Sequence, residues 1–416
     1  MNMPLQPDRK VLRRGTHRAA ALTATLARAR ELSAAAGITR VANVTGLDRV
    51  GVPVVAVYRP NARSLAVAQG KGLELPAALA SGLMEAIESY HAEHPQLPLC
   101  LASLRELRTR AAVCDVTGLP RVAGRQLDAD RALLWAQGVE LFSQAPLYVP
   151  YELVHTNFSL PLPTGSGAFL MSSNGLASGN TQSEAISHAL CELVERDALA
   201  LFHAIGGFGR RELRVDPATI DDPDCRALLA KLAAAELAYG VWEITTDIGL
   251  AAFVCAIVDQ TQDVFRPLYY ATGSGCHPAR EVALSRAITE AAQCRLTYIA
   301  GARDDGDRDF FERARSPDRL SHMRALLAQP LTAARAFSAA PSRAHETLEE
   351  DVVWALGRLR AVGLSQAIVV DLALPSMGVP VVRVIVPGLE SLRTAAGYTP
   401  GPRAARAVHA HAGAPA

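Results

Sequence analysis

Apolar residues recur at helical spacing in five segments of the chain, and this pattern predicts five helices. The second of them begins with Pro76, which suits the first turn of a helix, and ends before Pro95. The predicted helices cover residues 16–36, 76–94, 183–203, 278–300 and 347–361.

Runs rich in β-branched residues alternate with these helices and predict strands. The strand-like runs are residues 38–45, 52–58, 240–246, 250–259, 267–272, 367–374 and 379–387. A Pro- and Gly-rich stretch over residues 160–180 reads as a long loop, and loops of that length in compact domains are usually functional or disordered. Helices and strands interleave without the regular alternation of a doubly wound sheet, so the predicted fold class is mixed α/β (α+β).

Composition excludes several classes of protein. The 416 residues are half apolar, and 42 Lys and Arg balance 41 Asp and Glu, so the chain lacks the basic footprint of a nucleic-acid binder. The longest apolar runs are shorter than the ~20 residues that span a bilayer, so we expect no membrane segment. The seven scattered cysteines lack zinc spacing and indicate a reduced, cytoplasmic protein. We expect them to be structural, and only Cys276 falls in a predicted loop.

Three of the predicted helices carry charged residues at spacings that put them on one helix face. The faces are formed by Glu85 and Glu88 in the first, by Glu184, His188, Glu192 and Glu195 in the second, and by Arg286, Glu290 and Gln293 in the third. Like charges three residues apart repel one another, so each acidic pair needs either solvent or a cation.

Most charged helix faces are simply solvated, which is the first interpretation of any one pair. The flanks of Glu192 argue against it, because apolar residues stand on both sides of that acidic face. A buried carboxylate must be neutral, paired or metal-bound, since an unpaired ion in the interior costs several kcal/mol. Hard oxygen ligands in this number suit Mg²⁺ that bridges phosphates.

Two segments ahead of the acidic helices suit a phosphate. Small and amide residues over 172–181 precede the second acidic helix, and a helix N-terminus favours anions. Lys71 stands between two glycines ahead of the first acidic helix, although a plain turn explains the same residues equally well. The chain has neither a GxxxxGK[ST] loop nor a GxGxxG turn after a strand, so a phosphate or nucleotide site would be of another type.

The order and spacing of these motifs resemble the YcaO superfamily. The central motif reads SNGLASGNT over residues 173–181, EA at 184–185 and CELVERDA over 191–198. The earlier helix resembles the family through GKG at 70–72 and SGLMEAIE at 81–88, and the later helix through RAITE at 286–290 with Gln293. The resemblance covers roughly residues 37–389 and is specific because its central motif is long.

The resemblance implies a YcaO-type fold that binds ATP and Mg²⁺ through carboxylates on helices. The implied Mg²⁺ ligands or their supporting residues are Glu85, Glu88, Glu184, Glu192, Glu195 and Glu290. The implied nucleotide contacts are Asn180, Arg196, Arg286 and Gln293, with Lys71, Ser81, Ser173 and Asn174 as weaker candidates. No residue is assigned as catalytic, because the chain shows no Ser-His-Asp or Cys-His pairing. Lys10, Thr16 and Arg18 lie in the region where the family uses basic and hydroxyl residues, but their alignment stays open.

The resemblance also implies a reaction, in which ATP phosphorylates the oxygen of a peptide backbone amide after a nucleophile has added to the carbonyl. A side chain as nucleophile gives an azoline, and external sulfide gives a thioamide. The chain lacks the Pro-x-Pro-x-Pro tail of azoline-forming members, and its segments GITRVA (37–42) and VPGLE (386–390) resemble the group that works beside a TfuA protein. The implied partners are therefore a TfuA-like protein, a peptide or protein substrate and a sulfide donor.

Two other functions stay open at this point. One is an azoline-forming cyclodehydratase, and the other is a non-catalytic accessory factor for methylthiolation of a ribosomal protein. A homodimer also stays open as the oligomeric state. We divide the chain into a basic N-terminal segment with its helix (1–36), a YcaO domain (37–390) and a C-terminal tail (391–416).

Overall fold

The computed structural model describes residues 7–261, 270–391 and 397–412, so residues 267–269 of the strand predicted over 267–272 lie outside the described residues. The last two residues of that prediction belong to a strand that begins at Ala271. The chain forms two compact units, and each is assembled from separate segments. Unit 1 comprises Met1–Val11, Glu88–Ile205 and His345–Ala416. Unit 2 comprises Leu12–Ile87 and Gly206–Ala344. Helix α2 (Leu75–Glu93) crosses from unit 2 into unit 1 between Ile87 and Glu88.

Unit 2 contains two antiparallel sheets of three strands each. The first has the order β1 (Arg40–Asn43), β2 (Val54–Tyr58) and β3 (Val67–Lys71). The second has the order β10 (Ala271–His277), β9 (Ala251–Asp259) and β8 (Leu237–Glu243). The helices of this unit are α1 (Leu22–Leu32), α5 (Pro223–Ala234), α6 (Arg280–Ala300), α7 (Arg308–Ala314) and α8 (Pro317–Leu327).

Helix α6 packs against strands β10 and β9, and small residues on both sides allow the close approach. A Cβ atom on Gly273 of β10 would lie 2.1 Å from the backbone nitrogen of Ala291, a separation that real Cβ atoms essentially never show. A Cβ atom on Gly275 would lie 2.2 Å from the carbonyl oxygen of Ala283. These glycines therefore fix how near α6 lies to its sheet.

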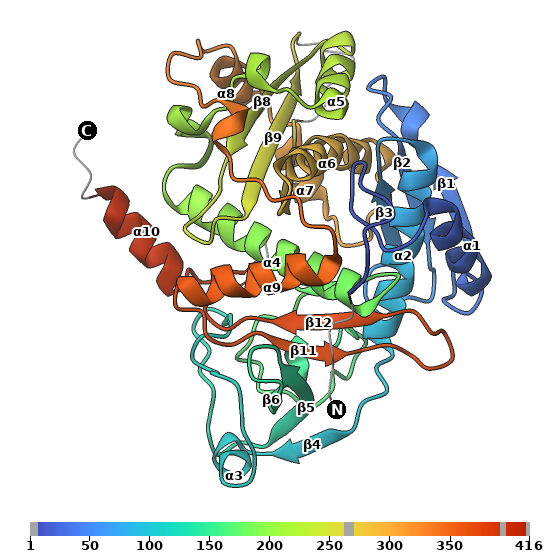
Figure 1. The fold of residues 1–416 in the computed structure, drawn as a ribbon, viewed down its shortest axis with the longest axis vertical. Helices are drawn as coiled ribbons and strands as arrows, with labels where there is room; N and C mark the ends of the chain where they lie inside the picture. The colour runs from blue at the N-terminus through green and yellow to red at the C-terminus, as the bar shows by residue number, and fades with distance from the viewer. Residues whose placement is uncertain (1–6, 262–269, 392–396, 413–416) are drawn as a thin grey trace. The chain divides into compact units, whose positions relative to one another are not determined.

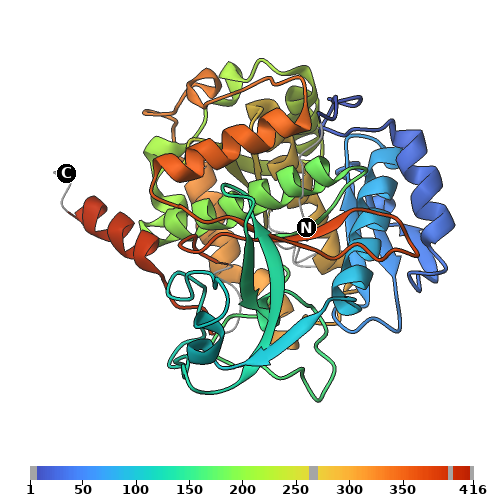
Figure 2. The same ribbon diagram turned by 60° about the horizontal axis from the view of Figure 1, so that its bottom comes forward.

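Unit 1 is built on one antiparallel sheet. Its strands run in the order β4 (Leu99–Ala102), β5 (Leu133–Glu140), β11 (Ile368–Asp371), β12 (Val381–Ile385) and β7 (Leu176–Ser178), with β6 (Pro146–Pro150) paired to β5. Helix α4 (Gln182–Ala204) packs on β12 and β7, and α9 (Leu348–Ala361) lies alongside α4 in both views (Figures 1 and 2). The short helix α3 (Leu104–Arg108) follows β4.

Helix α4 is held along its length. Thr181 caps its N-terminus by accepting a hydrogen bond from the Glu184 backbone N–H, and 15 of its 23 residues are buried, so it is an interior helix. In the C-terminal half of α4, the buried carboxylate of Asp197 accepts two hydrogen bonds from Arg403 on α10 (Pro402–Ala412). The donors are Nε and Nη2, each at 2.9 Å. This two-point ion pair fixes α10 to α4.

The mixed α/β fold class is confirmed, and so are the helices predicted around 76–94, 183–203, 278–300 and 347–361. The sequence did not predict strands β3, β4, β5 and β6. Strand β7 lies inside the stretch predicted as loop, because its three residues pair with β12. The predicted loop at Cys276 is wrong, since this residue is buried in β10 where it pairs with β9.

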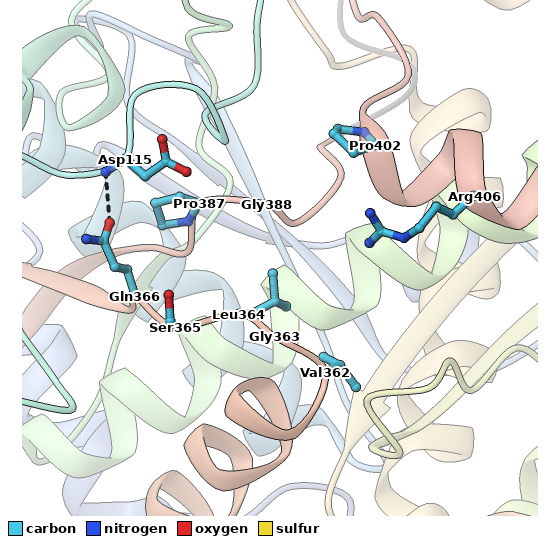
Figure 3. Close-up of a pocket in the computed structure, with 10 residues that line it drawn as sticks. All are labelled: Asp115, Val362, Gly363, Leu364, Ser365, Gln366, Pro387, Gly388, Pro402 and Arg406. Atoms are coloured by element: carbon cyan, nitrogen blue, oxygen red, sulfur yellow. Dashed lines mark hydrogen bonds between the residues drawn. The ribbon is translucent and has the colours of Figure 1, made fainter.

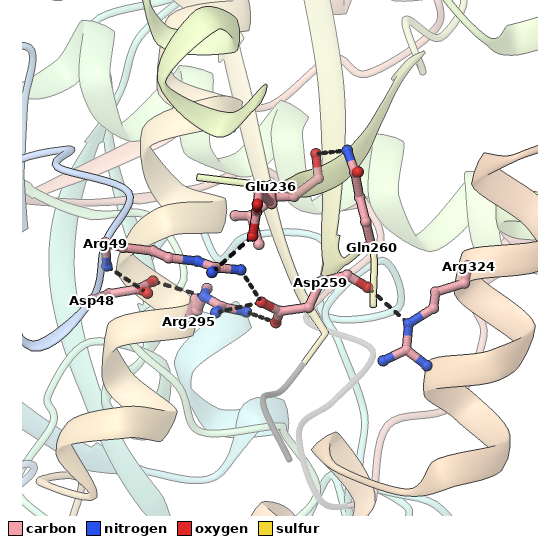
Figure 4. Close-up of polar contacts among 8 residues, drawn as sticks. Asp48, Arg49, Glu236, Asp259, Gln260, Arg295 and Arg324 are labelled. Atoms are coloured by element: carbon pink, nitrogen blue, oxygen red, sulfur yellow. Dashed lines mark hydrogen bonds and ion pairs between the residues drawn. The ribbon is translucent and has the colours of Figure 1, made fainter. Parts of the chain in front are cut away.

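A buried charge network joins three segments of unit 2 (Figure 4). The Arg295 side chain on α6 is fully buried and donates to Asp48 and to Asp259, each at 2.7 Å. Arg49 donates to the same Asp259 at 3.0 Å. Since Asp48 lies in the connection between β1 and β2 of the first sheet and Asp259 ends β9, Arg295 ties α6 to both sheets of the unit.

Replacing Arg295 with Met should strongly destabilise the protein, because it leaves two buried carboxylates without their main cation. We expect a loss of about 3–5 kcal/mol in the free energy of unfolding, measured by urea denaturation. The matched control is Arg105→Met, which removes an exposed pair with Asp130 and should leave the midpoint unchanged. Equal midpoints for the two variants would contradict the structural role given to Arg295.

Candidate functional site

The predicted acidic face of α4 lies in unit 1. Of its four residues, Glu184 and Glu195 are buried and Glu192 is half-buried, whereas His188 is exposed on this helix. At its N-terminal end both carboxylate oxygens of Glu184 accept hydrogen bonds from the Asn180 amide, each at 3.0 Å. Glu184 is 5% exposed, and Asn180 is held at the junction between β7 and the helix. Two of the predicted site residues are thus brought together, with the Asn180 side chain oriented by the carboxylate.

Glu192 and Glu195 flank a single arginine in the next two turns of α4. Arg196 Nη2 lies 3.5 Å from Glu192 Oε1, and Arg196 Nη1 lies 3.5 Å from Glu195 Oε1. These distances are those of loose ion pairs rather than tight hydrogen bonds. Glu195 is almost fully buried, and about a fifth of the Glu192 side chain reaches solvent. One guanidinium therefore lies beside two carboxylates of the same helix face.

Burial is the main reason why the pKa of Glu192 is raised above its ordinary value. Arg196 and Arg383 oppose the shift, and the neighbouring Glu195 charge adds to it. The folded protein therefore binds a proton at Glu192 more tightly than the unfolded chain does.

Arg383, which the sequence analysis did not single out, lies beside this acidic face. It belongs to β12 and is 1% exposed, and the charges of Glu192 and Glu88 act on it. Its Nη1 donates to the carbonyl oxygen of Asn174 at 2.8 Å, and the N–H of Gly175 donates to Glu192 Oε2 at 3.3 Å. The peptide group between Asn174 and Gly175 thus connects the buried cation to the carboxylate.

A signal for Arg383 was present in the sequence, because it is the one charged residue within the apolar run over 379–389. A charge inside a strand buried on both faces needs a specific partner or ligand.

Two buried polar atoms at this place have no hydrogen-bond partner among the described residues, namely Nη2 of Arg383 and Oδ1 of Asn174. Unsatisfied buried polar atoms are rare in native proteins and call for an explanation such as a ligand or a water molecule. A cation donor next to hard carboxylate oxygens fits a group that combines Mg²⁺ with phosphate. The residues present therefore suit Mg²⁺ and a nucleotide.

Helix α2 carries the remaining carboxylates predicted from the first acidic face. Glu88, in unit 1, is half-buried and is one of the two carboxylates that act on Arg383. Glu85, in unit 2, is exposed, and its charge acts on Arg303, which follows the end of α6 and was not predicted. Ser81 is half-buried on the same helix, and Ser173 is exposed in the loop before β7.

The predicted residues of unit 2 gather around α6. Glu290 forms an ion pair with Lys71 of β3 and accepts from the Ser274 hydroxyl of β10 at 3.2 Å. Gln293 donates to the carbonyl oxygen of Gln69 on β3 at 3.0 Å. Arg286 is half-buried one turn before Glu290. Lys71, Glu290 and Gln293 are thus close neighbours, and Gln69 and Ser274 are partners that the sequence did not suggest.

A separate cavity of about 280 Å³ lies in unit 1 between the turn after α9 and the start of α10 (Figure 3). Asp115, Gln366 and Arg406 contribute polar groups to it, and Gln366 accepts from the Asp115 backbone N–H at 2.8 Å. None of the predicted site residues lines this cavity.

Residues 69–390 match the family model described as YcaO cyclodehydratase, ATP- and Mg²⁺-binding. The chain therefore belongs to the YcaO family, and ATP and Mg²⁺ are the ligands for which the family is described. A protein from the tfuA 3′ region of Rhizobium leguminosarum bv. trifolii is 39% identical over 360 residues, covering 85% of this chain and 84% of that protein.

Solved structures share the fold. YcaO from Methanopyrus kandleri bound with AMPPCP and Mg²⁺ gives a TM-score of 0.73 at 23% identity, over 95% of this chain and 98% of that one. A heterocyclase in complex with substrate and cofactor gives 0.78 at 24% identity, over 95% of this chain and 55% of that one. The chain thus spans about half the length of that heterocyclase. Within the described residues, every helix is too short or too polar to cross a membrane.

The raised pKa of Glu192 predicts how stability depends on pH in the metal-free protein. The folded state binds this proton more tightly than the unfolded chain, so the stabilisation is complete below the unfolded pKa of about 4.3 and is lost as the pH rises through the folded pKa. Glu192→Gln should remove this pH-dependent stabilisation. As the pH rises from about 4 to neutral, the thermal midpoint of the variant should therefore fall less than that of the wild type.

The control is Glu312→Gln, which removes an exposed carboxylate on α7 and should keep the wild-type pH dependence. Identical pH profiles for Glu192→Gln and the wild type would contradict the raised pKa.

Proposed function

We propose that this protein is an ATP-dependent enzyme that phosphorylates the oxygen of a peptide backbone amide, and that with a TfuA-like partner and a sulfide donor it installs a thioamide. The observation that carries the proposal is the buried acidic face of α4, where Glu192 and Glu195 share Arg196 and face Arg383. Such a face would destabilise an ordinary hydrophobic core, because its like charges repel one another and lose their hydration on burial.

In the proposed reaction, hydrosulfide adds to the amide carbonyl carbon and the resulting oxyanion attacks the γ-phosphorus of ATP. ADP leaves, the carbon–oxygen bond then breaks with departure of phosphate, and the thiol proton is lost to give the thioamide. Mg²⁺ would supply charge neutralisation on the phosphates. The carboxylates Glu85, Glu88, Glu184, Glu192, Glu195 and Glu290 are proposed as its ligands or as their supports.

The basic and polar residues of the site are proposed to bind and orient the nucleotide. Arg196 would stabilise the charge on the transferred phosphoryl group, because its guanidinium lies beside Glu192 and Glu195 on the acidic face. Asn180 would be held in place by Glu184. The other proposed nucleotide contacts are Lys71, Ser81, Ser173, Asn174, Arg286 and Gln293.

The thioamide branch is supported by the relative from the tfuA 3′ region and by the segments over residues 37–42 and 386–390. It is not supported by the chemistry of the site, since an azoline-forming enzyme would use the same Mg²⁺ and ATP groups. The product therefore has to be measured.

The test combines the purified chain, a TfuA-like protein, ATP, Mg²⁺, sulfide and a precursor peptide encoded near the gene. We expect the peptide mass to increase by the difference between one sulfur and one oxygen. A product lighter by one water would identify the azoline reaction and overturn the thioamide assignment. ATP binding without peptide-dependent turnover would instead indicate the accessory role.

Glu195→Gln should lower product formation by about 10²–10³-fold, because the loss of one charge weakens the electrostatic stabilisation of phosphoryl transfer. Glu312→Gln, far from the acidic face in sequence and exposed, should retain wild-type turnover. Circular dichroism checks that both variants are folded. Full activity of a folded Glu195→Gln protein would contradict the role given to this carboxylate.

A further inference from the structure

The most unusual polar side chain outside the predicted site is that of Arg383. It lies in β12, where its backbone pairs with Val370 of β11 on one side and Leu176 of β7 on the other. Its side chain is 1% exposed, so an ionised group of full charge is placed inside the sheet of unit 1. Such a placement is costly unless the charge is compensated and its donors are used.

Two of the guanidinium nitrogens of Arg383 have acceptors. Nε donates to the carbonyl oxygen of Val154 at 3.2 Å, and Nη1 donates to the carbonyl oxygen of Asn174 at 2.8 Å. Nη2 has no acceptor among the described residues. The side chain is therefore aligned by two backbone contacts, which leave one charged donor unused.

The surroundings of Arg383 are acidic. Burial lowers the pKa of Arg383 to about 10, and the carboxylates of Glu192 and Glu88 act in the opposite direction, so the group remains charged at neutral pH. Within the described residues, the hydrogen bonds of Arg383 go to backbone carbonyl oxygens and not to these carboxylates. Its connection to Glu192 runs through the peptide group of Asn174 and Gly175. Arg383 thus faces the acidic face without closing a direct ion pair with Glu192.

A cation held next to carboxylates, with one donor left over, fits a bound anion that shares the metal of those carboxylates. We propose that Arg383 is a further nucleotide-binding residue, whose Nη2 donates to a phosphoryl oxygen of ATP bound with Mg²⁺. This inference rests on the proposed function, since it requires the acidic face of α4 to hold the metal. Phosphoryl oxygens are the strongest acceptors for such a donor.

An alternative role for Arg383 is charge compensation alone, in which the positive charge offsets Glu192 and Glu88 and Nη2 contacts only water. Lysine separates the two roles, because it keeps the positive charge but cannot reproduce the planar guanidinium with its second terminal nitrogen. A pure compensating role therefore predicts that Arg383→Lys binds nucleotide like the wild type.

The experiment measures the dissociation constants of ATP, ADP and AMP by calorimetry at saturating Mg²⁺, for the wild type and Arg383→Lys. We expect Arg383→Lys to weaken ATP binding by about tenfold to a hundredfold, as the loss of one charge-assisted hydrogen bond requires. The shortest nucleotide that still shows the loss identifies the phosphate that is contacted. The control is Arg214→Lys, which changes a buried arginine of unit 2 that also has a guanidinium nitrogen without an acceptor among the described residues, and it should bind ATP like the wild type.

Wild-type affinity in a folded Arg383→Lys protein would overturn the inference. If the wild type itself does not bind ATP with Mg²⁺, the proposed function fails as a whole, together with the role given to Arg383. Should Arg383→Lys not fold, crystals of the wild type with Mg²⁺ and AMPPCP decide the question. A phosphoryl oxygen within hydrogen-bond distance of Nη2 supports the inference, and a water molecule in that place overturns it.

Discussion

The repulsion between two carboxylates on a buried helix is the constraint on which the site depends. Glu192 and Glu195 lie in adjacent turns of α4, and burial removes much of the water that would screen them. Arg196 compensates them only loosely, at 3.5 Å from each. Arg383 on a neighbouring strand also acts on the charge of Glu192. The metal-free protein therefore keeps an acidic face that a divalent cation would relieve.

The fold holds this face in place from several sides. Four elements pack on α4, namely strands β12 and β7 and helices α9 and α10. The ion pair between Arg403 and Asp197 also holds α4 at the residue directly after Arg196. The backbone at Gly175 has φ +79°, and a Cβ atom there would lie 2.2 Å from the carbonyl oxygen of Val384. Only glycine can occupy this position, and the position orients the peptide group that connects Arg383 to Glu192.

The sequence predicts much of this arrangement, because helical periodicity and charge spacing are local properties. The periodic segments form α2, α4, α6 and α9. Glu192 and Glu195 of α4 lie beside one arginine, as their spacing predicts, whereas His188 of the same predicted face is exposed. The strands over 99–150 carried no clear pattern, and Cys276 was wrongly placed in a loop because its burial depends on pairing with β9 and on the packing of α6, which are not local properties. Arg383 was missed for the same reason, since its contacts come from residues more than 200 positions away.

The partners of Glu290 illustrate the same limit of sequence reasoning. Its pairing with Lys71 joins two motifs that were noticed separately, whereas the Ser274 contact depends on the register of β10. The side chains that lie on one helix were thus predictable as a set, and those contributed by other strands were found only in the folded structure.

The central claim is that the carboxylates of the acidic helices hold Mg²⁺ and that ATP binds through this metal. The most direct test is calorimetric titration of the wild-type protein with ATP, once with Mg²⁺ and once with the metal removed by EDTA. The account predicts saturable binding that depends on Mg²⁺ and disappears in EDTA. Binding of ATP with the same affinity in EDTA, or no binding in either condition, would contradict it.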